Sequence, residues 1–432
     1  MDVVEVAKSA KNASVALAAV KDDVKNGALA EIAKVLRARS QQIVSANKED
    51  LTAAENNNLA APLLKRLKFD EGKIADCIAG IESLIKLDDP LGRTLSATEL
   101  DEGLQLCKVS CSLGVIGVIF ESRPDALVQI STLCLKSGNA VLLKGGSEAQ
   151  HTNKVLAELI SRASEAAGIP KGWLGLMETR ADVAEILKLD EYINLIVPRG
   201  SNEFVRYIMD NTNIAVLGHA EGICHVYVDA DADLDMAVNI VVDSKCQYVA
   251  VCNAAETLLV DAKIAEEFLP KVKAALEQNG VELRGCEKTA SIIGVKPATE
   301  QDWSTEYLDK ILSIKVVAGL DEAIEHINRY GSGHTDTIVT ADRQKAAKFM
   351  ELVDSANVFW NASTRFSDGY RYGLGAEVGI STNKIHARGP VGLEGLVIYK
   401  WKLLGTGQIV ADYSGKNARK FTHKKLQKDC EL

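Results

Sequence analysis

Cys252 is the residue whose type and setting point most directly to chemistry. It lies in the stretch QYVAVCNAAETLLV (247–260), where an apolar run that predicts a buried strand gives way to small residues. A thiolate at the end of such an element could act as a nucleophile. Free cysteine is also among the most buried residue types. Taken alone, the stretch therefore also fits a thiol that only fills the core.

Two glycine-containing turns have the composition of phosphate-binding loops. LLKGGSEA (142–149) and IVPRGSNEFV (196–205) each place a basic residue, glycine and serine between a predicted strand and a predicted helix. Ligands bind outside the carboxyl ends of parallel strands, and helix N-termini favour phosphate. Neither turn matches a dinucleotide fingerprint or a Walker loop. Plain turns between strand and helix remain the alternative.

Polar and charged residues gather in three further stretches. FESRPDAL (120–127) ends a predicted strand, and LGHAEGICH (217–225) carries two histidines and a glutamate. An exposed turn, and a structural histidine with a surface glutamate, are the alternatives to ligand binding here. Between 359 and 396, glycines and aromatic residues alternate with a set of donors that could hold carboxylate or phosphate: Asn361, Ser363, Thr364, Arg365, Arg371, Lys384, His386 and Arg388.

The composition excludes several classes of protein. The net charge of −9 and the sequence pI near 5.5 argue against nucleic acid or an anionic membrane as the main partner. No apolar run reaches the roughly 18 residues of a membrane span, and the charged N-terminal stretch does not resemble a signal peptide. Nine scattered cysteines suggest reduced thiols in a cytoplasmic protein. No cysteine or histidine spacing suggests zinc, so no metal is expected.

The elements that must position these residues follow from hydrophobic periodicity. Helices are predicted over the first 85 residues. From about residue 113, strands alternate with helices, which predicts parallel βαβ units and doubly wound sheets. The strands of a first block are expected at 113–121, 139–146, 173–178, 193–200 and 214–219, and those of a second block at 225–229, 256–260, 314–319, 336–340 and 356–361. The segment 362–396 has little periodicity and is expected to be irregular.

The order of these motifs resembles the γ-glutamyl phosphate reductase (glutamate-5-semialdehyde dehydrogenase) family, a branch of the aldehyde dehydrogenase superfamily. The similarity runs through LLKGGSEA, VPRGSN, LGHAEGICHVYVDADADLD and CNAAETLLV to the long segment 359–396. It covers nearly the whole chain. The resemblance implies an α/β fold of the aldehyde dehydrogenase type, with two doubly wound Rossmann-type domains and a small β-flap for dimerisation.

The resemblance also implies a reaction. Members of this family reduce L-glutamyl 5-phosphate to L-glutamate 5-semialdehyde with NADPH and release phosphate, the second step of proline synthesis. Cys252 matches the nucleophile that forms a thioacyl intermediate. Its backbone N–H and a nearby side chain would hold the oxyanion. The residues expected to bind the substrate or the oxyanion are Ser122, Arg123, His219, Glu221, Asn253, Asn361 and Arg365.

Two departures from ordinary aldehyde dehydrogenases bear on this chemistry. Those enzymes use a glutamate in an E-L-G-G motif to activate water, and His219 falls at that position here. Loss of this base suits an enzyme that must not hydrolyse its thioacyl intermediate, although Glu221 is only two residues away. The superfamily has a P-W-N turn whose asparagine helps to hold the oxyanion. In this sequence the turn reads ESRPD, and Arg123 falls near the position of that asparagine. We expect Arg123 to contact the phosphate or the oxyanion.

The cofactor residues and the domain boundaries are likewise implied by the resemblance. The NADP-binding domain is expected at 1–97 and 114–225, the catalytic domain at 226–395, and the flap with the C-terminal tail at 98–113 and 396–432. A homodimer is expected, and a glutamate 5-kinase is an expected partner because it supplies the labile substrate. The expected cofactor-binding residues are Lys144, Gly145, Gly146, Ser147, Glu148, Arg199, Gly200, Ser201 and Glu306.

Two rival functions are consistent with parts of the sequence. An ordinary or CoA-acylating aldehyde dehydrogenase would use a different acyl donor, and the arginine-rich segment together with the missing glutamate base argues against it. A catalytically silent protein on the same fold would not need Cys252 or the two phosphate-type turns.

Overall fold

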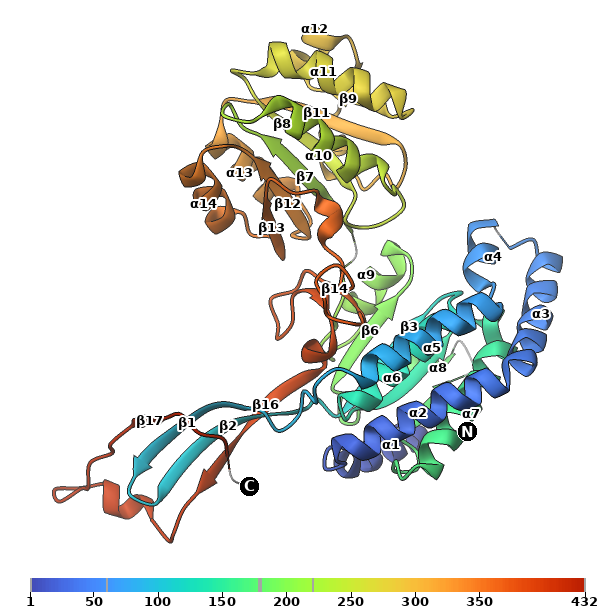
Figure 1. Cartoon of the computed structure of the whole chain (residues 1–432), viewed down its shortest axis with the longest axis vertical. Helices are drawn as coiled ribbons and strands as arrows, with labels where there is room; N and C mark the ends of the chain where they lie inside the picture. The colour runs from blue at the N-terminus through green and yellow to red at the C-terminus, as the bar shows by residue number, and fades with distance from the viewer. Residues whose placement is uncertain (1, 60, 178–180, 220, 431–432) are drawn as a thin grey trace. The chain divides into compact units, whose positions relative to one another are not determined.

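Amphipathic helices form the first part of the chain, as the spacing of its apolar residues predicts. They are α1 (Val3–Leu17), α2 (Asp22–Ala38), α3 (Ser40–Asn56), α4 (Ala61–Leu67) and α5 (Glu71–Ile85) (Figure 1). Asp2 caps α1 by accepting a hydrogen bond from the Val4 N–H, and Asp70 caps α5 in the same way. This computed structural model describes residues 2–59, 61–177, 181–219 and 221–430.

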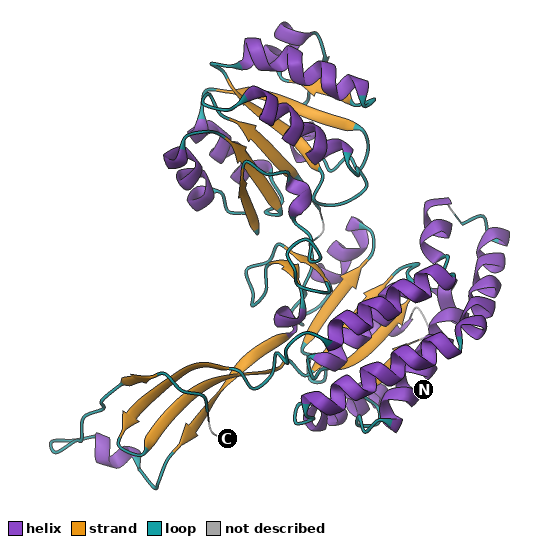
Figure 2. Ribbon diagram, in the orientation of Figure 1, coloured by secondary structure: helices purple, strands orange, loops and turns teal. Residues whose placement is uncertain are grey.

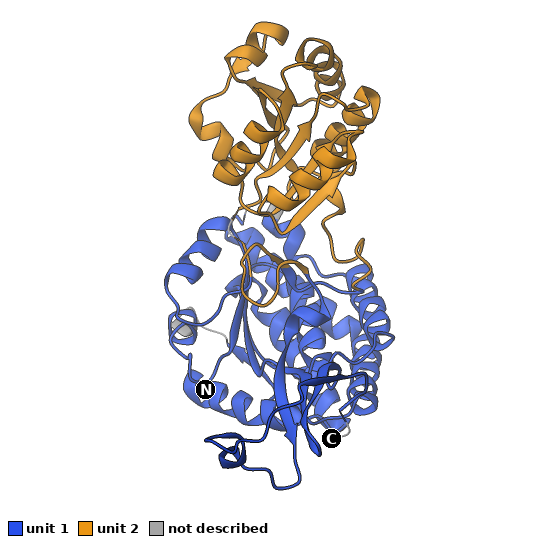
Figure 3. Cartoon of the chain, turned by 90° about the vertical axis from the view of Figure 1, so that its left-hand side faces the viewer, with its two compact units in different colours: residues 1–217, 375–379, 391–432 blue, residues 218–374, 380–390 orange. Residues whose placement is uncertain are grey.

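The chain divides into two compact units (Figure 3). Unit 1 comprises residues 1–217, 375–379 and 391–432, and unit 2 comprises residues 218–374 and 380–390. Among the described residues, none of the helices has the length and apolar character needed to cross a membrane.

Unit 1 contains a parallel sheet in the strand order β5-β4-β3-β6. The strands are β3 (Val115–Phe120), β4 (Ala140–Gly145), β5 (Leu174–Met177) and β6 (Leu195–Arg199), linked by α6 (Pro124–Lys136), α7 (Gln150–Ala166) and α8 (Ala181–Ile186). Helix α9 (Asn202–Asp210) follows β6. The strand predicted at 214–219 is wrong, because this stretch forms only an isolated bridge between Ile196 and Val216.

A separate antiparallel sheet in unit 1 is the expected flap (Figure 2). It has the order β16-β2-β1-β17, with β1 (Thr94–Asp101), β2 (Leu104–Ser112), β16 (Val397–Leu404) and β17 (Lys424–Leu426). Strand β16 pairs with β2 along its whole length, from Val397 opposite Ser112 to Leu404 opposite Gln105. Its other edge is unpaired among the described residues of the chain.

Unit 2 is a second doubly wound domain, with a parallel sheet in the order β10-β9-β11-β8-β7-β12-β13. Its strands are β7 (Cys224–Val228), β8 (Ala255–Asp261), β9 (Glu282–Gly285), β10 (Lys296–Pro297), β11 (Ile311–Val317), β12 (Thr335–Val339) and β13 (Asn357–Trp360). Its helices are α10 (Leu234–Cys246), α11 (Ala265–Gln278), α12 (Glu287–Ile293), α13 (Leu320–Tyr330) and α14 (Arg343–Leu352). Strands β7, β8 and β12 are buried along their whole length.

The predicted strand before Cys252 is also wrong. Residues 247–254 form turns between α10 and β8, so the thiol precedes a strand instead of ending one. The segment 362–396 is irregular as predicted. It contains only short elements, namely η3 (Thr364–Phe366), β14 (Gly379–Ser381), β15 (Gly389–Val391) and η4 (Leu393–Leu396).

Candidate active site

Cys252 lies in a loop that is fastened to a second segment of unit 2. The neighbouring Asn253 is buried, and its side-chain amide donates a hydrogen bond to the Ser367 carbonyl at 2.7 Å. The Thr364 hydroxyl donates to the Asn253 carbonyl, also at 2.7 Å. Cys252 itself is half-buried. These bonds hold the loop in place, while the thiol keeps access to solvent. The expected contact of Asn253 with the oxyanion or the substrate stays a prediction.

Gly222 presses directly against the back of this loop. A Cβ atom at this position would lie 2.2 Å from the Cys252 carbonyl oxygen and 2.4 Å from its Cα. Only glycine permits such a close approach of two backbones. The Cys224 thiol lies two residues further on and donates to the same carbonyl at 3.2 Å. The segment before β7 therefore fixes the backbone that carries the candidate nucleophile.

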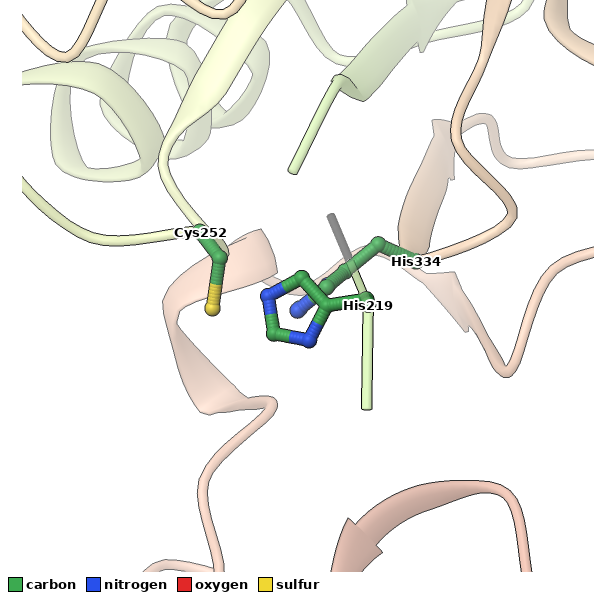
Figure 4. A group of neighbouring side chains, drawn as sticks. All are labelled: His219, Cys252 and His334. Carbon is green, nitrogen blue, oxygen red and sulfur yellow. The ribbon is translucent and has the colours of Figure 1, made fainter. Parts of the chain in front are cut away.

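Two histidines face the thiol (Figure 4). Three atoms that could bind a metal lie within 4.8 Å of one another, one each from His219, Cys252 and His334. Figure 4 shows a ring nitrogen of His219 turned toward the Cys252 sulfur. The two imidazoles meet edge to face with their centroids 4.9 Å apart. His219 was expected at the site from the sequence, whereas His334 was not.

Hydrogen bonds orient both rings. The Nδ1 atom of His219 lies 2.8 Å from the Ile380 carbonyl oxygen, so this nitrogen carries the proton and donates. The Nδ1 atom of His334 lies 2.8 Å from the Thr335 hydroxyl. The Nε2 atom of His334 is buried and has no hydrogen-bond partner among the described residues.

Burial keeps the group around the thiol neutral. Desolvation is the main cause that lowers the pKa of His334 well below its ordinary value, and electrostatic repulsion from His219 lowers this pKa further. Desolvation also raises the pKa of the Cys224 thiol well above its ordinary value. Cys224 is therefore a protonated hydrogen-bond donor behind the loop, and the exposed part of the site is left to Cys252.

Positive charge reaches the site through Arg365. This side chain is 8% exposed, and its Nε–H donates to the Gln247 side-chain oxygen at 2.9 Å. Burial and then repulsion from Arg371 lower the pKa of Arg365, while the charges of Asp368 and Cys252 oppose that shift. Because a guanidinium stays protonated in proteins, it can stabilise a thiolate at Cys252 or hold an anionic substrate.

Three other expected residues of unit 2 lie in different settings. Both amide atoms of Asn361 bond the Thr340 backbone at 3.0 Å, which gives this side chain a structural role. Glu221 is half-buried beside Gly222. Glu306 is half-buried, and its charge adds to the main effect of burial in raising the pKa of Glu256. Substrate or cofactor binding by these three residues stays a prediction.

The carboxyl ends of β3, β4 and β6 form a polar edge in unit 1, which we call the ligand edge: residues 121–123, 144–148 and 199–201. The Glu148 carboxylate accepts hydrogen bonds from the Ser122 backbone N–H at 2.6 Å and from its hydroxyl at 2.5 Å. The Glu121 carboxylate accepts one from the Ser201 N–H at 3.1 Å, where Ser201 caps α9. Two carboxylates thus occupy donors that could also hold a phosphate.

Close approaches and positive charges complete the ligand edge. A Cβ on Gly145 would lie 2.2 Å from the Asn153 side-chain amide nitrogen, and one on Gly200 would lie 2.5 Å from a Glu121 oxygen. Lys144 is nearly buried, and its ammonium donates to the Gly145 carbonyl. Arg123, also on this edge, forms an ion pair with Asp125 at 3.2 Å. The remaining residues of the edge include Gly146, Ser147 and Arg199. Glycines, backbone donors and basic groups together fit the phosphates of a dinucleotide.

Comparisons with known proteins agree with this geometry. The model of the aldehyde dehydrogenase family matches residues 1–294. The γ-glutamyl phosphate reductase of Pelotomaculum thermopropionicum is 65% identical over 99% of both chains, and that of Acetivibrio thermocellus is 65% identical over 100% of both. The crystal structure of γ-glutamyl phosphate reductase from Thermotoga maritima superimposes with a TM-score of 0.93 at 42% identity, and covers 95% of this chain and 100% of that one.

Proposed function

Because the chain belongs to the aldehyde dehydrogenase family, and within it to the γ-glutamyl phosphate reductases, we propose that Cys252 is its catalytic nucleophile. The enzyme reduces L-glutamyl 5-phosphate to L-glutamate 5-semialdehyde, the second step of proline synthesis from glutamate. The observation that carries the proposal is the half-buried Cys252 thiol, with two imidazoles turned toward it and the Arg365 charge nearby.

The thiolate of Cys252 attacks the acyl carbon of the substrate. A C–S bond forms, the bond from carbon to the phosphate oxygen breaks, and phosphate leaves with the electron pair. When bound, a nicotinamide cofactor would supply the hydride needed to reduce the resulting thioacyl group. The C–S bond then breaks, which returns the thiolate and releases the aldehyde.

His219 is proposed to accept the thiol proton. Its Nδ1–H is committed to the Ile380 carbonyl at 2.8 Å, which leaves the other ring nitrogen as the basic one. That nitrogen faces the Cys252 sulfur in Figure 4. The buried, neutral His334 supports this role, because a second positive imidazole would oppose protonation of His219.

Arg365 and Arg371 are proposed to hold the anionic groups of the substrate. The Arg371 guanidinium donates to the Arg365 carbonyl at 3.0 Å, so the two residues lie in one turn of the irregular segment. A glutamyl phosphate carries both a phosphate and an α-carboxylate, and each suits a guanidinium fork. On unit 1, Arg123 and Ser122 remain proposed substrate contacts.

The cofactor is a nicotinamide nucleotide, as the family implies, and we propose that it is NADPH. The residues proposed to hold it are those of the ligand edge: Lys144, Gly145, Gly146, Ser147, Glu148, Arg199, Gly200 and Ser201. Ser122 donates two hydrogen bonds to the Glu148 carboxylate, but these neutral donors leave its negative charge in place. Glu148 therefore disfavours a nearby 2′-phosphate, and the proposal of NADPH rests on the family.

The assembly proposed for the enzyme is a homodimer that pairs through the flap. Strand β16 is an edge strand with exposed apolar side chains, including Ile398, Trp401 and Leu403. Such an edge tends to pair with another strand.

A glutamate 5-kinase is proposed as the supplier of the labile acyl phosphate. All nine cysteines are free thiols, which supports a reducing compartment such as the cytoplasm.

The test of the proposed function is the reverse reaction. The enzyme is incubated with NADP⁺ and glutamate semialdehyde, supplied as pyrroline-5-carboxylate, and NADPH absorbance is followed with and without inorganic phosphate. We expect NADPH to form only with phosphate, and Cys252→Ala to lower the rate at least about a thousandfold. Cys246→Ala, which removes another half-buried thiol of unit 2, serves as the matched control and should retain activity.

Two outcomes would contradict the proposal. NADPH formation without phosphate would mean that water resolves the thioacyl group, as in hydrolytic aldehyde dehydrogenases. Formation that requires CoA would assign a different acyl acceptor.

A further inference from the structure

We propose that His219, Cys252 and His334 form an inhibitory binding site for Zn²⁺. One donor atom from each residue lies within 4.8 Å of the other two, and all three come from unit 2. A thiolate and two neutral imidazoles are donors that Zn²⁺ prefers over Mg²⁺ or Ca²⁺. Sequence spacing could not reveal this set, because each residue lies in a different segment (Figure 4).

The second nitrogen of each imidazole is already placed as metal sites require. Histidines that bind metals usually donate their other ring N–H to a carbonyl or another acceptor, which fixes the tautomer. His219 does so through Nδ1 to the Ile380 carbonyl at 2.8 Å. The Nδ1 atom of His334 meets the Thr335 hydroxyl at 2.8 Å, and its buried Nε2 has no partner among the described residues. A bound ion would supply that missing partner.

The distances are within reach of side-chain rotation. A tetrahedral zinc ion with Zn–S near 2.3 Å and Zn–N near 2.0–2.1 Å separates its ligand atoms by about 3.3–3.6 Å. Because the three donors already lie within 4.8 Å of one another, no pair must approach by more than about 1.5 Å. Cys252 and His219 are half-buried and can adjust, whereas His334 is fully buried and would serve as the fixed ligand. Water would complete the fourth position.

The surroundings limit the affinity. The guanidinium of Arg365 interacts with Cys252 and repels a cation at the same place. We therefore expect a reversible site, weaker than a structural site with four protein ligands. Binding converts the Cys252 thiol to a zinc thiolate and releases its proton to solvent.

The consequence for activity follows from the proposed role of Cys252. A zinc-bound thiolate has its electron pair committed to the metal and cannot attack the acyl phosphate. Inhibition therefore rests on the proposed function, whereas binding of the metal does not. A binding measurement and an activity measurement can separate the two.

The binding experiment uses the full chain, freed of metal and kept reduced. Zn²⁺ affinity is measured by competition with a chromophoric chelator, and Co²⁺ is used as a spectroscopic substitute whose absorption reveals a thiolate ligand. We expect one reversibly bound ion per chain and a cobalt–thiolate band. Cys252→Ser and His219→Gln should each weaken binding at least about a hundredfold. Cys246→Ser and His423→Gln, which alter a half-buried thiol and an exposed histidine elsewhere, should leave it unchanged.

His334→Gln completes the set and should weaken binding to a similar extent. Because this residue is buried, its folding is checked first by circular dichroism. If it does not fold, protection of Cys252 from iodoacetamide by Zn²⁺ in the wild-type chain, lost in His219→Gln, provides the same evidence. Binding of Zn²⁺ by Cys252→Ser as tightly as by the wild type would overturn the site, as would a cobalt spectrum without a thiolate band.

The activity experiment adds Zn²⁺ to the reductase assay and then removes it with EDTA. We expect inhibition at the concentration that fills the measured site, with full recovery after chelation. If zinc fills this site and turnover persists, the site stands and the nucleophilic role of Cys252 is wrong.

Discussion

The ligand edge of unit 1 and the Cys252 loop of unit 2 secure their polar groups in opposite ways. At the ligand edge, backbone donors are bonded by the half-buried carboxylates of Glu121 and Glu148. Around Cys252, backbone packs on backbone at Gly222, and the flanking polar groups are fully buried. A long carboxylate side chain can be displaced by an incoming phosphate, whereas packed backbone cannot yield. The first region is suited to exchanging partners, and the second to keeping one geometry.

The largest effect that this comparison predicts concerns buried ion pairs. Lys245 at the end of α10 and Glu256 in β8 flank the Cys252 loop, 2.5 Å apart and both fully buried. At pH 8, where Glu256 is largely ionised, Lys245→Ala leaves its buried carboxylate without a cationic partner, which should lower the free energy of unfolding by about 3–5 kcal/mol. Urea denaturation measures this change. The double variant Lys245→Met with Glu256→Leu should recover most of the loss, because it leaves no unpaired charge.

A pair in unit 1 provides the matched control. Lys25 is as buried as Lys245, but its partner Asp89, at 2.8 Å, is 24% exposed. Lys25→Ala therefore leaves a carboxylate that water can reach, and should cost less than half as much stability. Equal losses in the two variants would show that the two units do not differ in this respect.

The second prediction compares two glycines. Gly222→Ala places a methyl group 2.2 Å from backbone of Cys252, so the catalytic loop must shift. We expect kcat to fall at least about a hundredfold, which corresponds to ~3 kcal/mol. Gly200→Ala at the ligand edge meets only the side chains of Glu121 and Phe204, which can rotate away. That variant should raise the KM for the cofactor a few-fold with little change in kcat. Similar kcat values in both variants would refute the comparison.

The same contrast explains what the sequence could and could not predict. The turns around Lys144 and Ser201 are local motifs, and the rule that ligands bind at the carboxyl ends of parallel strands places both at one edge. The pairing of Glu148 with Ser122 depends on side-chain rotamers and on a contact between distant segments, so periodicity carries no sign of it. The fold class followed from alternating strands and helices over most of the chain.

The Cys252 region was harder to predict, because its geometry comes from tertiary contacts. The β-branched run before the thiol has strand propensity, yet bonds from Asn253 to Ser367 and the close packing of Gly222 hold it in turns. His334 follows a glycine-rich turn far along the chain and has no motif of its own. Only the fold brings it to the thiol.

The third prediction concerns pH. Burial is the main cause that raises the pKa of Glu256 to about 7 from 4.5, with Lys245 acting in the opposite direction. A raised pKa means that the folded state binds this proton more tightly than the unfolded state. The associated stability is complete below about pH 4.5 and is lost as pH rises through about 7. At roughly 1.4 kcal/mol per pKa unit, the loss is on the order of 3–4 kcal/mol.

Comparison of two proteins isolates this contribution. The free energy of unfolding is measured from pH 4.5 to 8 for the wild type and for the double variant Lys245→Met with Glu256→Leu. As pH rises through this window, the wild type should lose free energy of unfolding relative to the double variant. A difference that stays constant with pH would contradict the assignment to Glu256.

The smallest predicted effect lies at the ligand edge. Glu148→Gln removes a negative charge beside the expected phosphates but keeps an oxygen that can accept from Ser122. Loss of the repulsion should lower the KM for NADPH by about fivefold, close to 1 kcal/mol, and that for NADH by less, since NADH lacks the 2′-phosphate. The kcat should stay within about twofold, because nothing in unit 2 changes. Ser122→Ala, which removes one hydrogen bond and no charge, is the control. A KM that rises in Glu148→Gln would instead mean that this carboxylate accepts a hydrogen bond from the cofactor, and the ligand edge would then be as fixed in its partners as the Cys252 loop.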